Sequence, residues 1–162
     1  MYQFNRLIDD AKVIVAAQNA LLTTTVGDTD YVSMKGYERL TILISILNAT
    51  TVTGGAVTLK QATAVAGTNE KALSFTKMYR NIDTAAAEAL TEVAVVSDTF
   101  TTDATNSKGL LYVIEVSASD LDVSNGFDCV RLDVTGSVAS LGTVIYILRG
   151  QRYSTNVTAT GN

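Results

Sequence analysis

Hydrophobic and polar residues alternate along most of the chain with the two-residue period of β-strands. In the clearest run, YERLTILISILN at residues 37–48, one face is entirely aliphatic, with Leu40, Ile42, Ile44 and Ile46. The opposite face is mixed, with Thr41, Leu43, Ser45 and Leu47. This pattern is typical of a central strand in a two-layered β-structure.

Three later runs alternate in the same way. In GLLYVIEVSAS, Tyr112, Ile114 and Val116 lie opposite Leu111, Val113 and Glu115. In FDCVRLDVTG, Val130, Leu132 and Val134 face inward, while Cys129, Arg131 and Asp133 share the other face. The last run, GTVIYILRGQRYS, is apolar on both sides until Arg149 and Gly150. We therefore expect further strands here.

Glycines and short apolar runs suggest how the strands connect. Gly54-Gly55 separates the run at 37–48 from AVTLKQAT, which predicts a hairpin. A third run, ALSFTKMYRN, places Leu73, Phe75 and Tyr79 on one side. The alanine-rich segment that follows, IDTAAAEALTEVAVVS, predicts an irregular or briefly helical crossing that begins near Asp83 or Thr84 and then a strand.

The pattern as a whole predicts an all-β protein: a single-domain antiparallel β-sandwich, jelly-roll-like, with at most one or two short helices. We expect an N-terminal arm or short amphipathic segment over residues 1–30, the sandwich over 31–154 and a flexible C-terminal tail over 155–162. The 162 residues suffice for one domain with a real core.

Composition narrows the range of functions. The chain has no histidine, which removes Ser-His-Asp and Cys-His catalysis, and its one cysteine excludes an internal disulfide and four-cysteine zinc sites. The net charge is −4 without basic clusters, so we expect no nucleic-acid partner. No apolar run reaches the roughly 20 residues of a membrane span, and we interpret the N-terminus as mature protein without a signal peptide.

One stretch has the composition of a calcium loop. Between Ser119 and Val134, SDLDVSNGFDCVRLDV contains Asp120, Asp122 and Asp128. Counted from Asp120, however, the EF-hand positions that require Gly and Glu hold Asn125 and Arg131. Ser-Asn-Gly also favours a chain reversal. We predict a turn between strands, with a looser cation site as the alternative.

Two other chemical groupings are weaker. Cys129 lies beside Asp128 in a strand, where burial and negative neighbours disfavour a thiolate, so we interpret it as a small packed side chain. Glu115 with Asp120 or Asp122 would be a carboxylate pair for glycoside hydrolysis, but the 7% aromatic content gives little support to a sugar cleft. We expect no enzymatic activity, no cofactor and no metal.

Both ends of the chain carry residues that are common at protein interfaces. RGQRYS near the C-terminus combines arginine and tyrosine, and the N-terminal MYQFNRLIDD sets apolar side chains among charges. The interface residues predicted from these segments are Tyr2, Phe4, Leu7, Arg149, Arg152 and Tyr153.

The order of these segments resembles a known family. LIDDAK, YVSMKGYERLTILI, GGAVTLKQAT, LDVSNGFDCVRLDVTG and VIYILRGQRYS follow one another as in a group of small head proteins of tailed bacteriophages. Members of this group are decoration or cement proteins and minor capsid proteins. The likeness runs from about Leu7 to Tyr153. It is one of pattern, with GYER before the first strong strand and RGQRY after the last, and neither is a catalytic motif.

The resemblance implies a β-sandwich on the virion surface, present in many copies. Its expected partners are the major capsid protein and copies of the chain itself, as a homo-oligomer on the particle that bridges and stabilises capsid subunits. Two alternatives remain: a tail or baseplate component, and a carbohydrate-binding β-sandwich.

Overall fold

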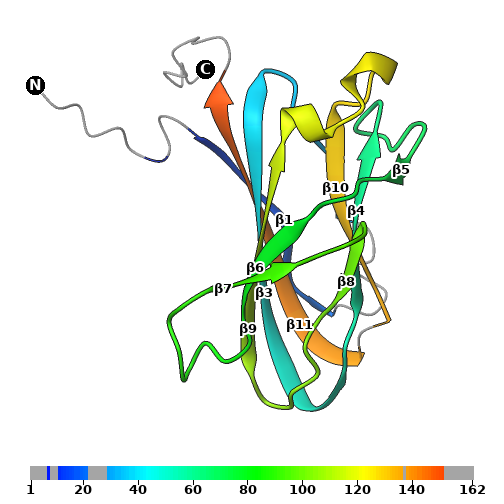
Figure 1. The fold of residues 1–162 in the computed structure, drawn as a ribbon. Coiled ribbons are helices and arrows are strands. Elements are labelled where there is room, and N and C mark those ends of the chain that lie inside the picture. Colours follow the sequence, from blue (N-terminus) through cyan, green and yellow to red (C-terminus); the bar gives the residue numbers. More distant parts are fainter. Residues whose placement is uncertain (1–6, 8–10, 22–28, 137, 152–162) are drawn as a thin grey trace, which may run out of the picture.

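The protein folds as an antiparallel β-sandwich, which confirms the predicted fold class. The structure, a computed structural model, describes Leu7 and residues 11–21, 29–136 and 138–151. In this part of the chain two layers of strands face each other (Figure 1). The strands are β1 (Ala11–Leu21), β2 (Val32–Ser33), β3 (Tyr37–Thr53), β4 (Ala56–Ala62), β5 (Lys71–Ala72), β6 (Lys77–Asn81), β7 (Thr91–Ala94), β8 (Thr99–Thr101), β9 (Gly109–Ser117), β10 (Cys129–Thr135) and β11 (Val138–Gln151).

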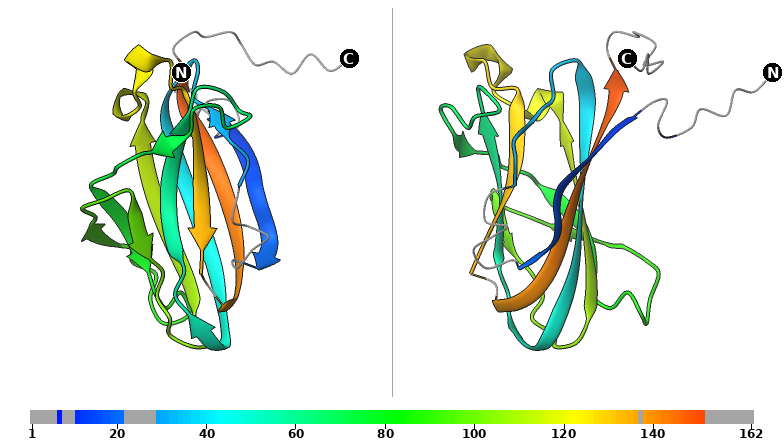
Figure 2. Two further views of the ribbon diagram at one scale, coloured as in Figure 1. Left: turned by 90° about the vertical axis from the view of Figure 1, so that its right-hand side faces the viewer. Right: turned by 180° about the vertical axis from the view of Figure 1, so that it is seen from behind.

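The two sheets differ in width. Sheet A has six strands in the order β1-β11-β3-β9-β6-β7. Sheet B has five, in the order β2-β10-β4-β5, with β8 also paired to β4. Two short 3₁₀ helices, η1 (Ala118–Asp120) and η2 (Val123–Asn125), connect β9 to β10 at one end of the sandwich. The views in Figure 2 show β1 along one side of the molecule, next to β11.

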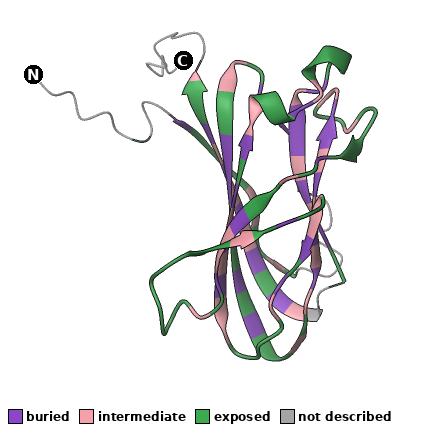
Figure 3. Cartoon of the chain, viewed as in Figure 1, coloured by how far each residue is buried: buried purple, intermediate pink, exposed green. Residues whose placement is uncertain are grey.

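The core lies between the sheets and includes the aliphatic face of β3 and the residues of β10 that were predicted to face inward. Leu40, Ile42 and Ile44 of β3 are fully buried, as are Leu132 and Val134 of β10. Figure 3 shows buried and exposed positions alternating along the strands. Burial of this aliphatic surface, at roughly 25 cal/mol per Å², is the main favourable contribution to folding.

A buried tyrosine links the two sheets through hydrogen bonds. The hydroxyl of Tyr146 on β11 accepts from the backbone N–H of Leu132 on β10 at 2.9 Å and lies 2.5 Å from Thr29 Oγ1. Thr29 in turn donates to the carbonyl of Leu132 at 2.6 Å. Since the single Thr29 proton is used there, Tyr146 donates to Thr29. β2 pairs with only Cys129 and Val130 of β10. The side chains of Thr29 and Tyr146 therefore provide the hydrogen bonds of the Leu132 backbone, which lies beyond the end of β2.

The predicted hairpin around Gly54-Gly55 is wrong. β3 pairs with β9 and β11 in sheet A, whereas β4 pairs with β10, β5 and β8 in sheet B, so the chain crosses between the layers at this point. A Cβ on Gly54 would lie 2.4 Å from the carbonyl oxygen of Thr102, which only glycine permits. Gly55 donates to Thr102 Oγ1 at 2.9 Å and thereby fixes the crossing.

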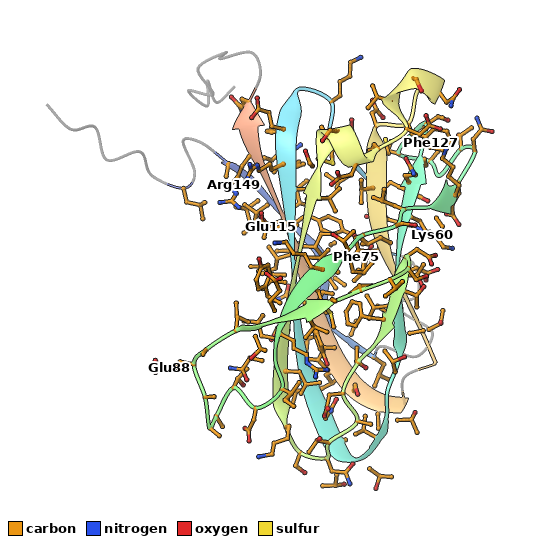
Figure 4. All side chains as sticks on the ribbon, viewed as in Figure 1. Lys60, Phe75, Glu88, Glu115, Phe127 and Arg149 are labelled. Atoms are coloured by element: carbon orange, nitrogen blue, oxygen red, sulfur yellow. The ribbon has the colours of Figure 1, made fainter. Side chains whose placement is uncertain are left out.

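The third predicted run is two strands. β5 belongs to sheet B and β6 to sheet A, and Phe75 lies between the layers as the chain crosses again (Figure 4). Leu73 is buried as expected, but in β6 Met78 faces the core, with 3% exposure. Tyr79 therefore lies on the outer face, because neighbouring residues of a strand point to opposite sides.

Two less regular regions are also clear. β1 lies within the range predicted as an arm, yet it pairs with β11, so sheet A begins at Ala11 rather than near residue 31. After β6, Asp83 accepts backbone bonds from Ala86 and Ala87 in a single irregular turn before β7, as predicted. In the described ranges no helix is long and apolar enough to cross a bilayer.

We predict that Tyr146→Phe destabilises the protein by about 1–2 kcal/mol, because Thr29 and Leu132 lose a buried hydrogen-bond partner without a change in packing. The measurement is the free energy of unfolding in urea. Tyr37→Phe makes the same chemical change at a half-buried position and is the matched control, with an expected effect within about 0.5 kcal/mol. Equal effects of the two substitutions would show that the link between the sheets contributes nothing.

Candidate protein-interaction face

The outer face of sheet A carries a continuous row of apolar side chains. The strand register places Val15 opposite Ile145, Ile145 opposite Leu43, Leu43 opposite Val113, and Val113 opposite Tyr79. We call these five residues the apolar row. Each points away from the core, because its neighbours in the strand point inward. Val15 is 56% exposed and the other four are half-buried.

More apolar surface borders this row. Val13 is 44% exposed and pairs with Ile147 on one side of it. Leu47 is 59% exposed and pairs with Leu141 towards the other end of the strands. Exposed aliphatic residues that occur singly need no explanation, but a contiguous patch on a sheet face is typical of an interaction site.

Two ion pairs lie at the borders of the apolar row. Arg149 Nη2 donates to Glu115 Oε1 at 3.1 Å and to Thr41 Oγ1 at 2.8 Å, beside the apolar row. At the opposite border Lys77 lies 3.4 Å from Glu92. Figure 4 shows Arg149 and Glu115 together on the outer side of sheet A. Arg39 is exposed on the same face, directly opposite Arg149. A partner that covers the apolar row therefore meets two ion pairs at its borders and one further arginine.

The outer face of sheet B is polar. Lys60 Nζ lies 2.7 Å from Glu70 Oε1 and 2.9 Å from Asp133 Oδ2, while Arg131 lies 2.8 Å from Glu70 Oε2. The Tyr31 hydroxyl donates to Glu70 at 2.6 Å. Figure 4 places Lys60 on the side of the molecule opposite Arg149 and Glu115. The two outer faces thus differ in kind, one apolar and the other covered by a network of ion pairs.

The pKa values on sheet B reflect this network. Hydrogen bonds from Lys60 and Tyr31 lower the pKa of Glu70, and the hydrogen bonds to Glu70 and Asp133 raise the pKa of Lys60. Both groups therefore stay ionised over the neutral range. These charges satisfy one another and remain partly hydrated, as is usual on a face that contacts water.

The structure describes two of the predicted interface residues. Arg149 lies on the outer face of sheet A, and Leu7 is 56% exposed. The other four lie outside the described residues: Tyr2, Phe4, Arg152 and Tyr153. Alternation along the sequence does not identify the apolar row. Its only local signals are β11, which is apolar on both sides, and the outward Leu43 and Val113, and these are equally typical of central strands.

The three aspartates of the candidate calcium loop point to separate partners. Asp120 accepts from the backbone N–H of Ser117 at 2.8 Å and caps η1. Asp122 forms an ion pair with Lys71, and Asp128 accepts from the Cys129 thiol at 3.0 Å. Gly126 supplies the left-handed residue of the turn, with φ of 82°. Within the described ranges, no group of three His, Cys, Asp or Glu side chains is arranged to hold a metal ion.

The remaining candidate groups are likewise engaged in structure. Cys129 is 2% exposed, and burial together with the hydrogen bond to Asp128 raises the pKa of its thiol to about 12, as its neighbours predicted. Glu115 contacts Thr41 and Arg149, while Asp120 and Asp122 have the partners described above. These contacts give each carboxylate a structural role.

A small pocket opens at the end of the sandwich where η1 and η2 lie. It has a volume of about 290 Å³, and its lining is mostly apolar, including Met34, Tyr37, Leu121 and Phe127. Lys71 Nζ lies 4.0 Å from the centre of the Phe127 ring, which supports the wall from outside. Its volume lies at the lower end of the range of small-molecule pockets, roughly 300–1,000 Å³.

Comparison with known proteins gives little further information. No protein-family model matches the chain, and no curated protein matches it. A similar solved structure is the crystal structure of the SPBc2 prophage-derived protein YomS. It is 13% identical, and the match covers 87% of this chain and 94% of that chain with a TM-score of 0.49.

We predict that the ion pair between Asp122 and Lys71 makes stability depend on pH in the acid range. Hydrogen bonds from Lys71, Asn125 and Ser124 lower the pKa of Asp122 to about 2 in the folded protein, against ~3.9 when unfolded. The stabilisation is therefore complete above about pH 4 and is lost as the pH falls towards 2. Asp122→Asn should remove this part of the pH dependence.

The measurement is the free energy of unfolding of both proteins between pH 2 and 6. The two curves should converge at the acid end and separate above about pH 4. Glu88→Gln removes a negative charge from an exposed position on the segment before β7 and controls for the change in net charge (Figure 4). Parallel curves for Asp122→Asn and the unsubstituted protein would contradict the prediction.

Proposed function

We propose that the protein is a structural virion protein that decorates the outer surface of a bacteriophage head and stabilises it by bridging capsid subunits. The contrast between the two outer faces carries this proposal: sheet A offers an apolar row, and sheet B is covered by ion pairs. The sequence resemblance to phage head proteins supports the choice of partner.

The physical case begins with desolvation. Covering the apolar row and its borders releases water from aliphatic side chains on β1, β3, β9 and β11, at roughly 25 cal/mol per Å² of apolar surface. Arg149 and Lys77 are paired with Glu115 and Glu92 within the face, so the cost of desolvating these four charges is reduced by partners already in place. Tyr79 and Arg149 at the borders are residue types enriched at interfaces.

The face of sheet B suits the side exposed to water. Its lysine, arginine and acidic groups satisfy one another without a partner, and burying this network against a protein would cost solvation without adding a new ion pair. A protein with this asymmetry attaches to a surface in one orientation.

Attachment in many copies explains how weak contacts stabilise a shell. A standard interface buries roughly 800 Å² on each partner. When one decorating unit contacts two capsid subunits, outward movement of either subunit must also break the contacts to its neighbour. The proposed action is mechanical and requires no catalytic group.

The location is tested by cryo-electron microscopy of particles from the phage that encodes the chain. We expect density for the sandwich on the outside of the head, with the outer face of sheet A towards the shell. Density on the tail or baseplate would overturn the capsid assignment. Saturable binding to glycans, with no density on the particle, would favour the carbohydrate-binding alternative.

For the docking face, we predict that Leu43→Lys weakens binding to heads that lack the protein by roughly 30-fold or more. Lysine places a charge where a leucine side chain would otherwise be buried at the centre of the interface, and the lost binding free energy is about 2 kcal/mol. Thr58→Lys adds the same charge at a half-buried position on the outer face of sheet B and should change binding less than threefold. Co-sedimentation with purified heads measures both, after thermal unfolding confirms that each variant is folded. The reverse result would assign docking to sheet B.

A further inference from the structure

β1 is a long edge strand with one open side. It has eleven residues, of which eight have a register partner in β11, and no other described strand pairs with β1. The other edge strands of the sandwich are short: β7 has four residues, and β2 and β5 have two each. Short edge strands are one way in which proteins avoid unwanted pairing, because they offer few free N–H and C=O groups. β1 lacks that protection.

The two halves of β1 differ. Beyond Val15 the register shifts twice, between Val15 and Ala17 and between Ala17 and Ala20, and Asn19 has a φ of 48°. Bulges and irregular backbone of this kind turn an edge away from a new strand. Residues 12–15 instead pair with β11 without interruption. Residues 13–16 contain neither proline nor a charged side chain. The open part of the edge is therefore the stretch 12–16, of which residues 12–15 are regular and Ala16 lies at the first register shift.

This stretch, KVIVA, is nearly symmetric about Ile14. In an antiparallel pair of two such strands centred on Ile14, Val13 of each copy lies opposite Val15 of the other. Both valines are exposed in the single chain, at 44% and 56%. Ile14 lies opposite Ile14 on the inner side, and Lys12 lies opposite Ala16. No like charges face each other, and β-branched pairs are favourable in this position.

We propose that the protein forms a two-fold symmetric dimer in which the β1 strands of two copies pair antiparallel about Ile14 and join the two copies of sheet A into one continuous sheet. The occupant of the open edge is thus a second copy of this chain. The pairing is isologous, since the same five residues serve both copies. It is a property of the free protein and does not rest on the capsid role.

The dimer would place both apolar rows on the same side. Directly opposite residues in an antiparallel pair point to the same face of the sheet, so Val13 and Val15 of both copies meet next to Ile147 and Ile145. The outer face of sheet A then continues across the two-fold axis. One dimer presents two identical docking faces in one surface, which is the geometry that bridging requires.

The register is tested by disulfide cross-linking in a Cys129→Ala background. Val13→Cys and Val15→Cys are made as separate proteins, each labelled by a tag of different mass, and are oxidised alone or as a mixture. Cα atoms of directly opposite residues lie about 4.5–5.5 Å apart, within the roughly 4.4–6.8 Å that a disulfide spans. We expect the mixture to give at least fivefold more covalent dimer than either protein by itself. Val13→Cys mixed with Leu47→Cys is the matched control and should give none above background.

The dimer itself is tested by light scattering after size-exclusion chromatography. The unsubstituted protein should have twice the monomer mass, and Val15→Lys should raise the dissociation constant at least tenfold. Gln18→Lys, at an exposed position beyond the first bulge, should leave it unchanged. A monomer at 100 μM, equal cross-linking in all mixtures, or a dimer broken by Leu43→Lys and not by Val15→Lys would each overturn the proposal. The last result would show that two copies pack face to face.

Discussion

The hydrogen bonds of Tyr146 fix which side of β11 faces the core. Its hydroxyl reaches the Leu132 backbone in the opposite sheet and Thr29, and the ring is fully buried. Side chains alternate along a strand, so an inward Tyr146 requires Ile145, Ile147 and Arg149 to point outward. A shift of β11 by one residue would bury Arg149, expose Val144 and Leu148, and leave the Leu132 N–H with Thr29 Oγ1 but without the tyrosine. The composition of the outer face is therefore coupled to what β11 buries on its other side.

The same constraint explains why the outer face could be predicted only in part. Alternation in the sequence identified the inward residues of β10 correctly, and in β3 the purely aliphatic face is the buried one. In β9 both faces are largely apolar, and alternation alone left the inward side open. β11 is apolar on both sides, and a period of two cannot then say which side is buried. Arg149 was selected as an interface residue from its type, but Leu43 and Val113 become part of a face only when the register between strands is known.

The errors at Gly54-Gly55 and at Tyr79 have a different cause. A glycine pair between two alternating runs is equally compatible with a hairpin within one sheet and with a crossing between sheets. The choice depends on Thr102, about 50 residues later in the chain, which approaches Gly54 and bonds Gly55. For β6, the local pattern placed Tyr79 on the same side as Leu73 and Phe75, yet Met78 and not Tyr79 faces the core. Contacts between residues far apart in the sequence leave no local signal. The ion pairs of Lys60 are of the same kind, because Asp133 is brought to Lys60 by the pairing of β4 with β10.

An apolar sheet face and an open strand edge are both hazards for an isolated protein, because each promotes aggregation. Here they adjoin, since Val13 and Val15 belong to the edge strand and to the outer face at once. Elsewhere the chain limits such exposure: three edge strands are short, β1 itself is bulged after Val15, and the outer face of sheet B carries paired charges. Because the unprotected features are confined to one region, a single mode of assembly can cover both. Pairing at the edge would bury the backbone groups of residues 12–16, and docking of the joined face would bury the rows on either side of the axis.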